Sequence, residues 1–157
     1  MKNKYIVLTF IIVLIDQITK YIITKLLNLN EIIYLIKNIL YITNVHNTGA
    51  AFSILEGNTY LLIIISIIAL YILNKIKLDS NNNTLNNIGY SLLYGGIIGN
   101  LIDRIIYKYV KDFIGIIIFK YYFPIFNIAD IAIVLGVLIL IIKNIKGDNN
   151  AISSKWR

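Results

Sequence analysis

The sequence contains no cysteine and a single histidine, His46. The absence of cysteine excludes disulfides, cysteine-ligated zinc, iron–sulfur clusters and thiol catalysis. One histidine argues against a histidine-rich metal site and against a Ser/His/Asp triad, and the sequence has neither an HExxH zinc motif nor a serine elbow. The sequence therefore predicts neither a bound metal nor a cofactor.

Charge is also scarce. Charged side chains make up 15% of the 157 residues, hydrophobic ones 58%, and the mean hydropathy is +0.75. A soluble domain needs more polar surface to cover its core, so we predict a single integral-membrane domain over residues 1–157. The net charge of +7 lies mostly in short segments that flank apolar runs. This pattern indicates membrane topology and contact with membrane lipids, not binding of nucleic acid.

Four segments approach the roughly 20 apolar residues of a membrane-spanning helix: 5–27, 59–73, 88–106 and 128–142. They predict an all-α membrane protein with four transmembrane helices. The first segment resembles the charged and apolar regions of a secretory signal, but it lacks a small-residue cleavage pattern, so we expect a retained span. Lysine and arginine are more numerous on the side of the two termini, which places both in the cytoplasm. Residues 147–157 are expected to form a flexible tail.

The segment between the first two spans, residues 28–58, is too long for a simple connection. Apolar and polar residues alternate around Tyr34 and Tyr41, and tyrosines are typical of the headgroup layer of a membrane. We therefore expect a small β-rich extracytoplasmic element after the first span, lying at the outer membrane surface.

Ionisable residues and asparagines of the spans gather near one face of the predicted bilayer. The group comprises Asp16 and Lys20 on the first span, Asn100, Asp103 and Arg104 on the third, Asn127 and Asp130 at the start of the fourth, and Asp112 in the loop before it. A charge at the bilayer centre costs roughly 2.5–3.5 kcal/mol and needs a partner or a function. Asp16 and Lys20, four residues apart, also allow the alternative of a structural ion pair. We interpret the cluster as an active site near the outer face.

Two further runs are rich in small residues. Gly95, Gly96 and Gly99 predict close helix packing and not a phosphate-binding loop, because the lysine and hydroxyl of a P-loop are absent. The run Asn47-Thr48-Gly49-Ala50-Ala51-Phe52-Ser53 indicates either a turn before the second span or a backbone edge presented to a peptide ligand. His46 beside it is expected to be a polar loop residue, not a ligand.

Five motifs follow one another along the chain: DQITK at 16–20, NTGAAFS at 47–53, GGIIGNLIDR at 95–104, VKDF at 110–113 and FNIAD at 126–130. In order and spacing they resemble the lipoprotein signal peptidases, also called signal peptidase II. The resemblance spans most of the chain and implies four membrane helices with a cytoplasmic N-terminus. It also implies a bacterial inner-membrane aspartyl endopeptidase. Such an enzyme cuts the signal peptide from a prolipoprotein just before a diacylglyceryl-modified cysteine.

The same resemblance makes Asp112 of VKDF and Asp130 of FNIAD the catalytic pair. It gives supporting or substrate-binding positions to Asp16, Lys20, Asn47, Asn100, Asp103, Arg104 and Asn127. Lys111 departs from the family pattern, in which an apolar residue is more usual before the catalytic aspartate. The sequence leaves open which aspartate is base and which is acid, which lipoproteins are substrates, and how the loops move over the site. It also leaves the oligomeric state open, and a monomer is compatible with it.

The chemistry of the residues leads in the same direction. Amide hydrolysis needs a nucleophile and a proton donor, and two carboxylates are the remaining candidates here. Two neighbouring aspartates share one proton, so one activates water while the other assists the carbonyl oxygen. A transporter or channel subunit is an alternative, since its polar residues would line an ion path, but it leaves the clustering at one face unexplained. A structural scaffold tied by ion pairs is the second alternative.

Overall fold

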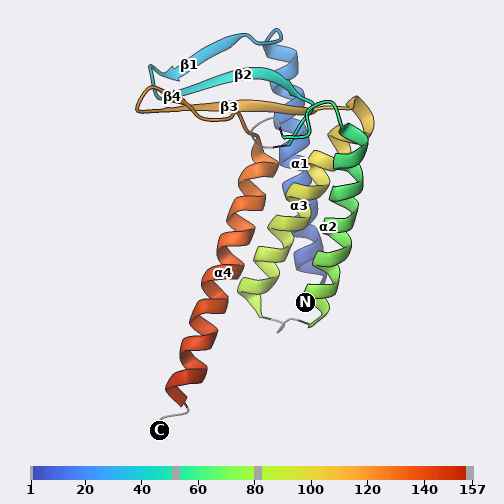
Figure 1. Cartoon of the computed structure of the whole chain (residues 1–157), viewed down its shortest axis with the longest axis vertical. Coiled ribbons are helices and arrows are strands. Elements are labelled where there is room, and N and C mark those ends of the chain that lie inside the picture. The colour runs from blue at the N-terminus through green and yellow to red at the C-terminus, as the bar shows by residue number, and fades with distance from the viewer. Residues whose placement is uncertain (1, 51–53, 80–82, 155–157) are drawn as a thin grey trace.

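The computed structural model describes the backbone of residues 2–50, 54–79 and 83–154, and the side chains of 5–50, 54–77 and 83–145. Ala51, Phe52 and Ser53 of the NTGAAFS motif lie outside this described part. Within it the chain forms α1 (Lys2–Leu26), β1 (Ile32–Ile36), β2 (Leu40–Asn47), α2 (Thr59–Asp79), α3 (Thr84–Tyr107), β3 (Val110–Ile118), β4 (Tyr121–Tyr122) and α4 (Ile128–Ser154). The helices gather into a bundle, the sheet crosses one end of it, and both termini lie at the other end (Figure 1).

Three of the described helices are long and apolar enough to cross a membrane, through Tyr5–Leu26, Thr59–Lys77 and Ile128–Ile145. Helix α3 is more polar, and it occupies the centre, in contact with each of the other three helices. Its buried face includes Asn100 and Asp103. Because neighbouring helices cover that face, α3 can carry polar side chains inside the bundle without exposing them to lipid.

Helices α2 and α4 continue past the predicted spans, to Asp79 and Ser154. Residues 147–154, which the sequence assigns to a flexible tail, continue α4 in the structure. A helix extends beyond its apolar segment because its backbone hydrogen bonds do not depend on apolar side chains. The chain's one proline, Pro124, precedes α4 and does not interrupt it.

The sheet is antiparallel with strand order β1-β2-β3-β4. It therefore draws on both outer segments, and the prediction of β-structure only after the first span was too narrow. Asp112 lies in strand β3, paired with Val45 of β2, and not in a loop. The first residues of β3 are buried continuously, so the strand lacks the alternation by which a half-exposed strand is read from sequence.

The glycines of α3 lie where this helix meets α1 and α4. A Cβ atom on Gly95 would lie 2.7 Å from Cβ of Ile12, and one on Gly99 would lie 2.6 Å from Oδ2 of Asp16. A Cβ on Gly96 would collide with the carbonyl oxygen of Ala129 in the first turn of α4. Small residues let helix backbones approach closely, and here they bring the polar face of α3 against the start of α4.

Candidate active site

Helix α4 begins with a reciprocal pair of hydrogen bonds between Asn127 and Asp130. The backbone N–H of Asp130 donates to Oδ1 of Asn127 (3.0 Å), and the backbone N–H of Asn127 donates to Oδ2 of Asp130 (3.1 Å). This is a capping box, in which side chains satisfy N–H groups that have no partner inside the helix. It holds the Asp130 carboxylate at the positive end of the helix dipole. The spacing N-x-x-D in FNIAD is the sequence signal for this capping box.

Asp112 reaches the same place from strand β3. Its Oδ1 accepts a hydrogen bond from Nδ2 of Asn127 (2.6 Å) and its Oδ2 accepts one from Nδ2 of Asn47 (2.8 Å). The residue is 3% exposed. Burial, and next the negative charge of Asp130, raise the pKa of Asp112 to about 7, against the opposing effect of the two amide donors.

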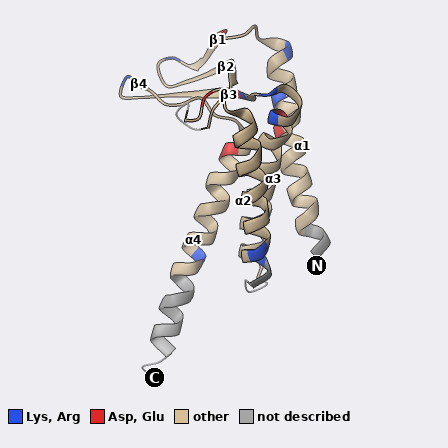
Figure 2. Ribbon diagram, turned by 45° about the vertical axis from the view of Figure 1, so that its right-hand side comes forward, with Lys and Arg blue, Asp and Glu red and all other residues tan. Residues whose placement is uncertain are grey.

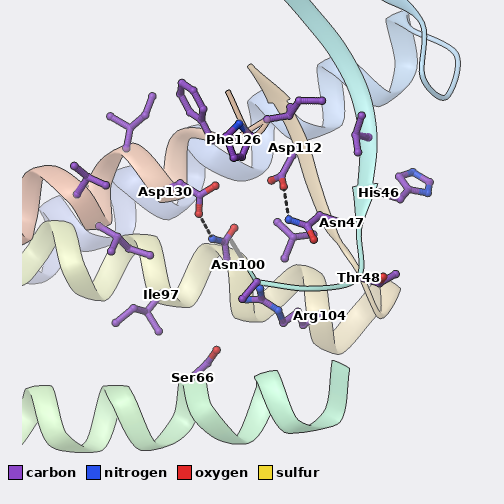
Figure 3. Close-up of a pocket in the computed structure, with 18 of the residues that line it drawn as sticks. His46, Asn47, Thr48, Ser66, Ile97, Asn100, Arg104, Asp112, Phe126 and Asp130 are labelled. Carbon is purple, nitrogen blue, oxygen red and sulfur yellow. Dashed lines mark hydrogen bonds between the residues drawn. The ribbon is translucent and has the colours of Figure 1, made fainter. Parts of the chain in front are cut away.

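Asn100 of α3 connects the two carboxylates to the bundle. Its Nδ2 donates to Oδ1 of Asp130 (2.7 Å), and its Oδ1 accepts from Nδ2 of Asn127 (3.1 Å) and from Nζ of Lys20 (2.9 Å). These contacts decide the orientation of the Asn100 amide, because the ammonium group of Lys20 can only donate. The amide nitrogen is thereby directed at Asp130 (Figure 3).

Lys20 lies at the centre of a fully buried ion cluster. Its Nζ is 2.8 Å from Oδ2 of Asp16 and 3.1 Å from Oδ2 of Asp103, with the three side chains almost completely inaccessible to solvent. The i, i+4 pair that the sequence predicts is thus present, and a second carboxylate from α3 joins it. A buried ion pair repays the cost of desolvating its charges only when the geometry is good and the remaining polar atoms are hydrogen-bonded.

Both carboxylates of this cluster also accept hydrogen bonds from backbone N–H groups of the site. Oδ1 of Asp16 accepts the N–H of Ala129 in the first turn of α4 (2.9 Å), and Oδ2 of Asp103 accepts the N–H of Lys111, next to Asp112 (3.1 Å). Gln17, which the sequence analysis did not select although it lies within DQITK, donates to Asp16, to Asp103 and to the carbonyl of Gly99. The cluster therefore connects α1 with the elements that carry Asp112 and Asp130.

The two aspartates face a cavity of about 1110 Å³ that also contains Asn47, Asn100 and Arg104 (Figure 3). Arg104 donates through Nη2 to the carbonyl oxygen of Gly49 (3.2 Å), so it connects α3 to the loop after β2. It forms no ion pair within 4 Å among the described residues. The cavity thus combines two carboxylates with one guanidinium group that has further donors.

Lys111 and His46 point away from the carboxylates. The two residues are register partners on β3 and β2, and the His46 ring stacks on Tyr109 at 3.7 Å between centroids. Nζ of Lys111 lies over the Tyr107 ring, 3.5 Å from its centroid. Burial, and then the charge of Lys111, lower the pKa of His46. His46 therefore belongs to a strand and not to a loop, and the cation of Lys111 is held by an aromatic ring.

The predicted catalytic, supporting and substrate-binding residues are all described, and they lie in this one region: the aspartates with Asn47, Asn100 and Asn127 directly around them, Arg104 at the same cavity, and Lys20, Asp16 and Asp103 behind. Among the residues described, no group of three His, Cys, Asp or Glu side chains is arranged to hold a metal ion. Fold and site together define a helical membrane protein with two carboxylates, one raised in pKa, at a cavity beneath an antiparallel sheet.

Comparison with known proteins agrees with this description. The family described as signal peptidase (SPase) II matches residues 8–146. The chain is 40% identical over 152 residues to the lipoprotein signal peptidase of Halalkalibacterium halodurans, covering 96% of this chain and 97% of that one. It is 41% identical over 139 residues to that of Anoxybacillus flavithermus, covering 88% and 83%. The chain belongs to the signal peptidase II family.

Solved structures show the same fold. A bacterial membrane enzyme determined by the in meso method at 2.3 Å superimposes with a TM-score of 0.87 and 39% identity, over 94% of this chain and 91% of that one. A second, determined by the same method at 1.9 Å, gives a TM-score of 0.83 and 39% identity over 92% and 94%. The arrangement of helices and sheet is therefore that of bacterial membrane enzymes.

Proposed function

We propose that this chain is a membrane-embedded aspartyl endopeptidase that removes the signal peptide from prolipoproteins, cutting before the diacylglyceryl-modified cysteine. One observation carries the proposal. Asp112 and Asp130 come from different elements, face one cavity, and are bonded to the same residue, Asn127. An arrangement that brings two carboxylates together in a buried site is unfavourable for stability alone, and it is the arrangement that hydrolysis by two aspartates requires.

The pair shares one proton, and we place it on Asp112, whose pKa is raised to about 7. We assign the role of base to Asp130, which lies in the first turn of α4 and accepts a hydrogen bond from the backbone N–H of Asn127. Asp130 takes a proton from water, whose oxygen attacks the scissile carbonyl carbon, while Asp112 donates its proton to the carbonyl oxygen. Collapse of the tetrahedral intermediate breaks the C–N bond and releases the amine with a proton from the pair. Arg104 holds a carbonyl group of the substrate through its remaining N–H donors.

The shape of the cavity supports a membrane-inserted substrate. On one side it is lined by Ile65, Ser66 and Ala69 of α2, and on the other by Ile131, Val134 and Leu135 of α4. Helix α2 packs on the bundle through α3, so this apolar cleft lies between two helices that do not close against each other. An apolar signal segment enters from the bilayer between α2 and α4, and its cleavage site meets the aspartates at the end of the bundle.

The same proposal includes the membrane topology. All four helices span the inner membrane, with α3 as the central polar span, both termini in the cytoplasm and the site near the outer face. The two termini lie at one end of the bundle and the sheet at the other, which this topology requires (Figure 1). A transporter or channel subunit is not favoured, because the polar contacts concentrate at the sheet end and the family is a peptidase family.

A cleavage assay on one precursor, with and without the diacylglyceryl group, tests the substrate. We expect cleavage of the modified form only, since a lipid group held in the leaflet places the peptide bond beside Asp112 and Asp130. Mass spectrometry of the products locates the cut, which should precede the modified cysteine. Equal cleavage of both forms, or a cut elsewhere, would contradict the proposal. The purified double variant Asp112→Asn, Asp130→Asn serves as the negative control.

The pH dependence tests the shared proton. Above the pKa of about 7, Asp112 loses its proton and the pair no longer contains an acid, so kcat should fall as the pH rises through about 7 to 9. The measurement is kcat on saturating lipidated substrate in detergent, with the enzyme returned to pH 6.5 to verify that the loss is reversible. A rate that increases steadily to pH 9 would show that a protonated carboxyl is not required.

A further inference from the structure

The end of the sheet farthest from α1 is built from two hairpin turns that lie side by side. One joins β1 to β2 through Lys37, and the other joins β3 to β4 through Phe119 and Lys120. A hydrogen bond from the N–H of Ile117 to the carbonyl of Ile39 (2.8 Å) connects them. In both views these turns extend sideways beyond the start of α4 (Figures 1 and 2). We call Ile36, Lys37, Ile39, Phe119, Lys120 and Tyr121 the tip cluster.

The tip cluster exposes large apolar side chains. Phe119 is 99% exposed, Tyr121 60%, and Ile36 and Ile39 each about half. Strand β1 beside it is exposed along its whole length. Apolar groups gathered at a sheet edge promote aggregation in water, so proteins normally cover them or replace them with charges.

The backbone of the second turn gives an independent reason to look for a ligand. Phe119 and Lys120 both have positive φ, 47° and 68°. A two-residue hairpin turn of this kind favours Asn-Gly or Gly-Gly, and a bulky residue in this region is strained. The turn itself would be more stable with other residues. Strain of this kind is often kept where function requires it, so the turn is a candidate for a role outside the fold itself.

The positive charge of the two turns indicates the chemistry of a partner. Each turn carries one lysine, Lys37 or Lys120, and there is no acidic residue in 32–55 or in 113–129. Figure 2 shows basic residues at both turns of this end of the sheet. Aromatic and lysine side chains together are typical of segments that lie in a membrane interface, and cationic groups there attract anionic headgroups.

We propose that the tip cluster is a membrane anchor that inserts Phe119 below the headgroups and binds anionic phospholipid through Lys37 and Lys120. The sheet crosses the helix axes at the end of the bundle, so the tip cluster lies over the lipid beside α4 and not over protein (Figure 1). The anchor holds the outer end of β3, the strand that carries Asp112. It does not depend on which reaction the site performs.

Tryptophan fluorescence tests the anchor without an activity assay. Trp156 is the chain's one tryptophan, so a Phe119→Trp, Trp156→Phe variant reports on the tip alone. The full chain is placed in phosphatidylcholine vesicles, with or without phosphatidylglycerol, whose acyl chains carry bromine, a contact quencher. We expect a blue-shifted emission that bromine quenches, more strongly with phosphatidylglycerol. Tyr121→Trp in the same background is a second reporter if the strained turn does not accept tryptophan.

The matched control removes the same charge at the other end of the bundle. Lys37→Gln with Lys120→Gln should weaken tip contact with the anionic vesicles by about 30-fold, as two lysines at a membrane surface predict. Lys75→Gln with Lys143→Gln should leave it unchanged. An emission typical of water, unaffected by bromine, would overturn the anchor. So would a blue shift that bromine does not quench and that disappears on dilution, which would mean a second copy covers the tip. Equal quenching in both kinds of vesicle would overturn the role of the anionic headgroup.

Discussion

Replacing Asp130 by asparagine is expected to lower kcat by roughly 10²–10⁴-fold, the range of a positioned acid–base group. Asparagine has nearly the same shape but cannot take a proton from water, and the same loss is expected for Asp112→Asn, which cannot donate one to the carbonyl oxygen. The measurement is single-turnover cleavage of a lipidated precursor. Glu31→Gln removes an equal charge from an exposed carboxylate in the connection between α1 and β1, and it should retain full activity.

Stability distinguishes lost chemistry from lost folding. The pKa of Asp112 is raised from 3.8 to about 7, so between these values the folded state keeps a proton that the unfolded state has released. The wild-type chain therefore loses stability as the pH rises across this window, and Asp112→Asn does not. Thermal unfolding in detergent should show that the stability of the variant, relative to that of the wild type, increases from pH 4 to pH 8. If both aspartate variants cleave at the wild-type rate while folded, the two-aspartate mechanism is wrong.

Replacing Lys20 by methionine is expected to destabilise the fold by about 3–5 kcal/mol, the effect of removing one partner of a buried ion pair. Methionine fills similar space, but Asp16 and Asp103 then face each other without a cation. Their backbone partners at Ala129 and Lys111 lose order with them. Unfolding in detergent measures the loss, and the activity should fall with it because Asn100 is no longer oriented.

The control for this variant is Lys25→Met, on the same helix but at its end, where Nζ lies over the Tyr21 ring. It should change the stability by well under 1 kcal/mol, as surface substitutions usually do. Adding Asp103→Asn to Lys20→Met should restore part of the lost stability, since it removes one of the two unpaired charges. The ion cluster would not have the importance assigned here if Lys20→Met and Lys25→Met unfolded at the same temperature.

The positions of the apolar helices could be predicted from the sequence because the bilayer acts on local composition. Each of the predicted spans coincides with one helix of the structure, the first running one residue past the end of α1 at Leu26, although whether α3 crosses the membrane stays a prediction. The Asp16–Lys20 pair could also be predicted from the local sequence, because residues four apart lie on the same face of a helix. Its second carboxylate, Asp103, could not be assigned to Lys20 because it depends on how α1 packs against α3.

Strand β3 is the clearest example of an element that could not be predicted from the local sequence. Its pairing with β2 joins Asp112 to Val45, which are 67 positions apart in the sequence, and strand pairing over such a separation depends on the completed fold. Arg104 is another. Its neighbour Asp103 turns toward Lys20, whereas Arg104, like Asn100 four residues before it, reaches the cavity and bonds to Gly49. One residue of offset on a helix was enough to separate a cavity residue from an ion cluster.

The sequence by itself determined that this is a membrane protein, where its apolar segments lie, and which motifs it shares with signal peptidase II. These properties depend on composition and on order along the chain. Only the tertiary structure decided that Asn127 bonds both aspartates and that Asn100 is oriented by Lys20. It also decided that both outer segments form one sheet. Hydrogen-bond direction and burial depend on contacts between atoms from several elements. Burial of Asp112 by these elements, with the nearby charge of Asp130, raises its pKa to about 7.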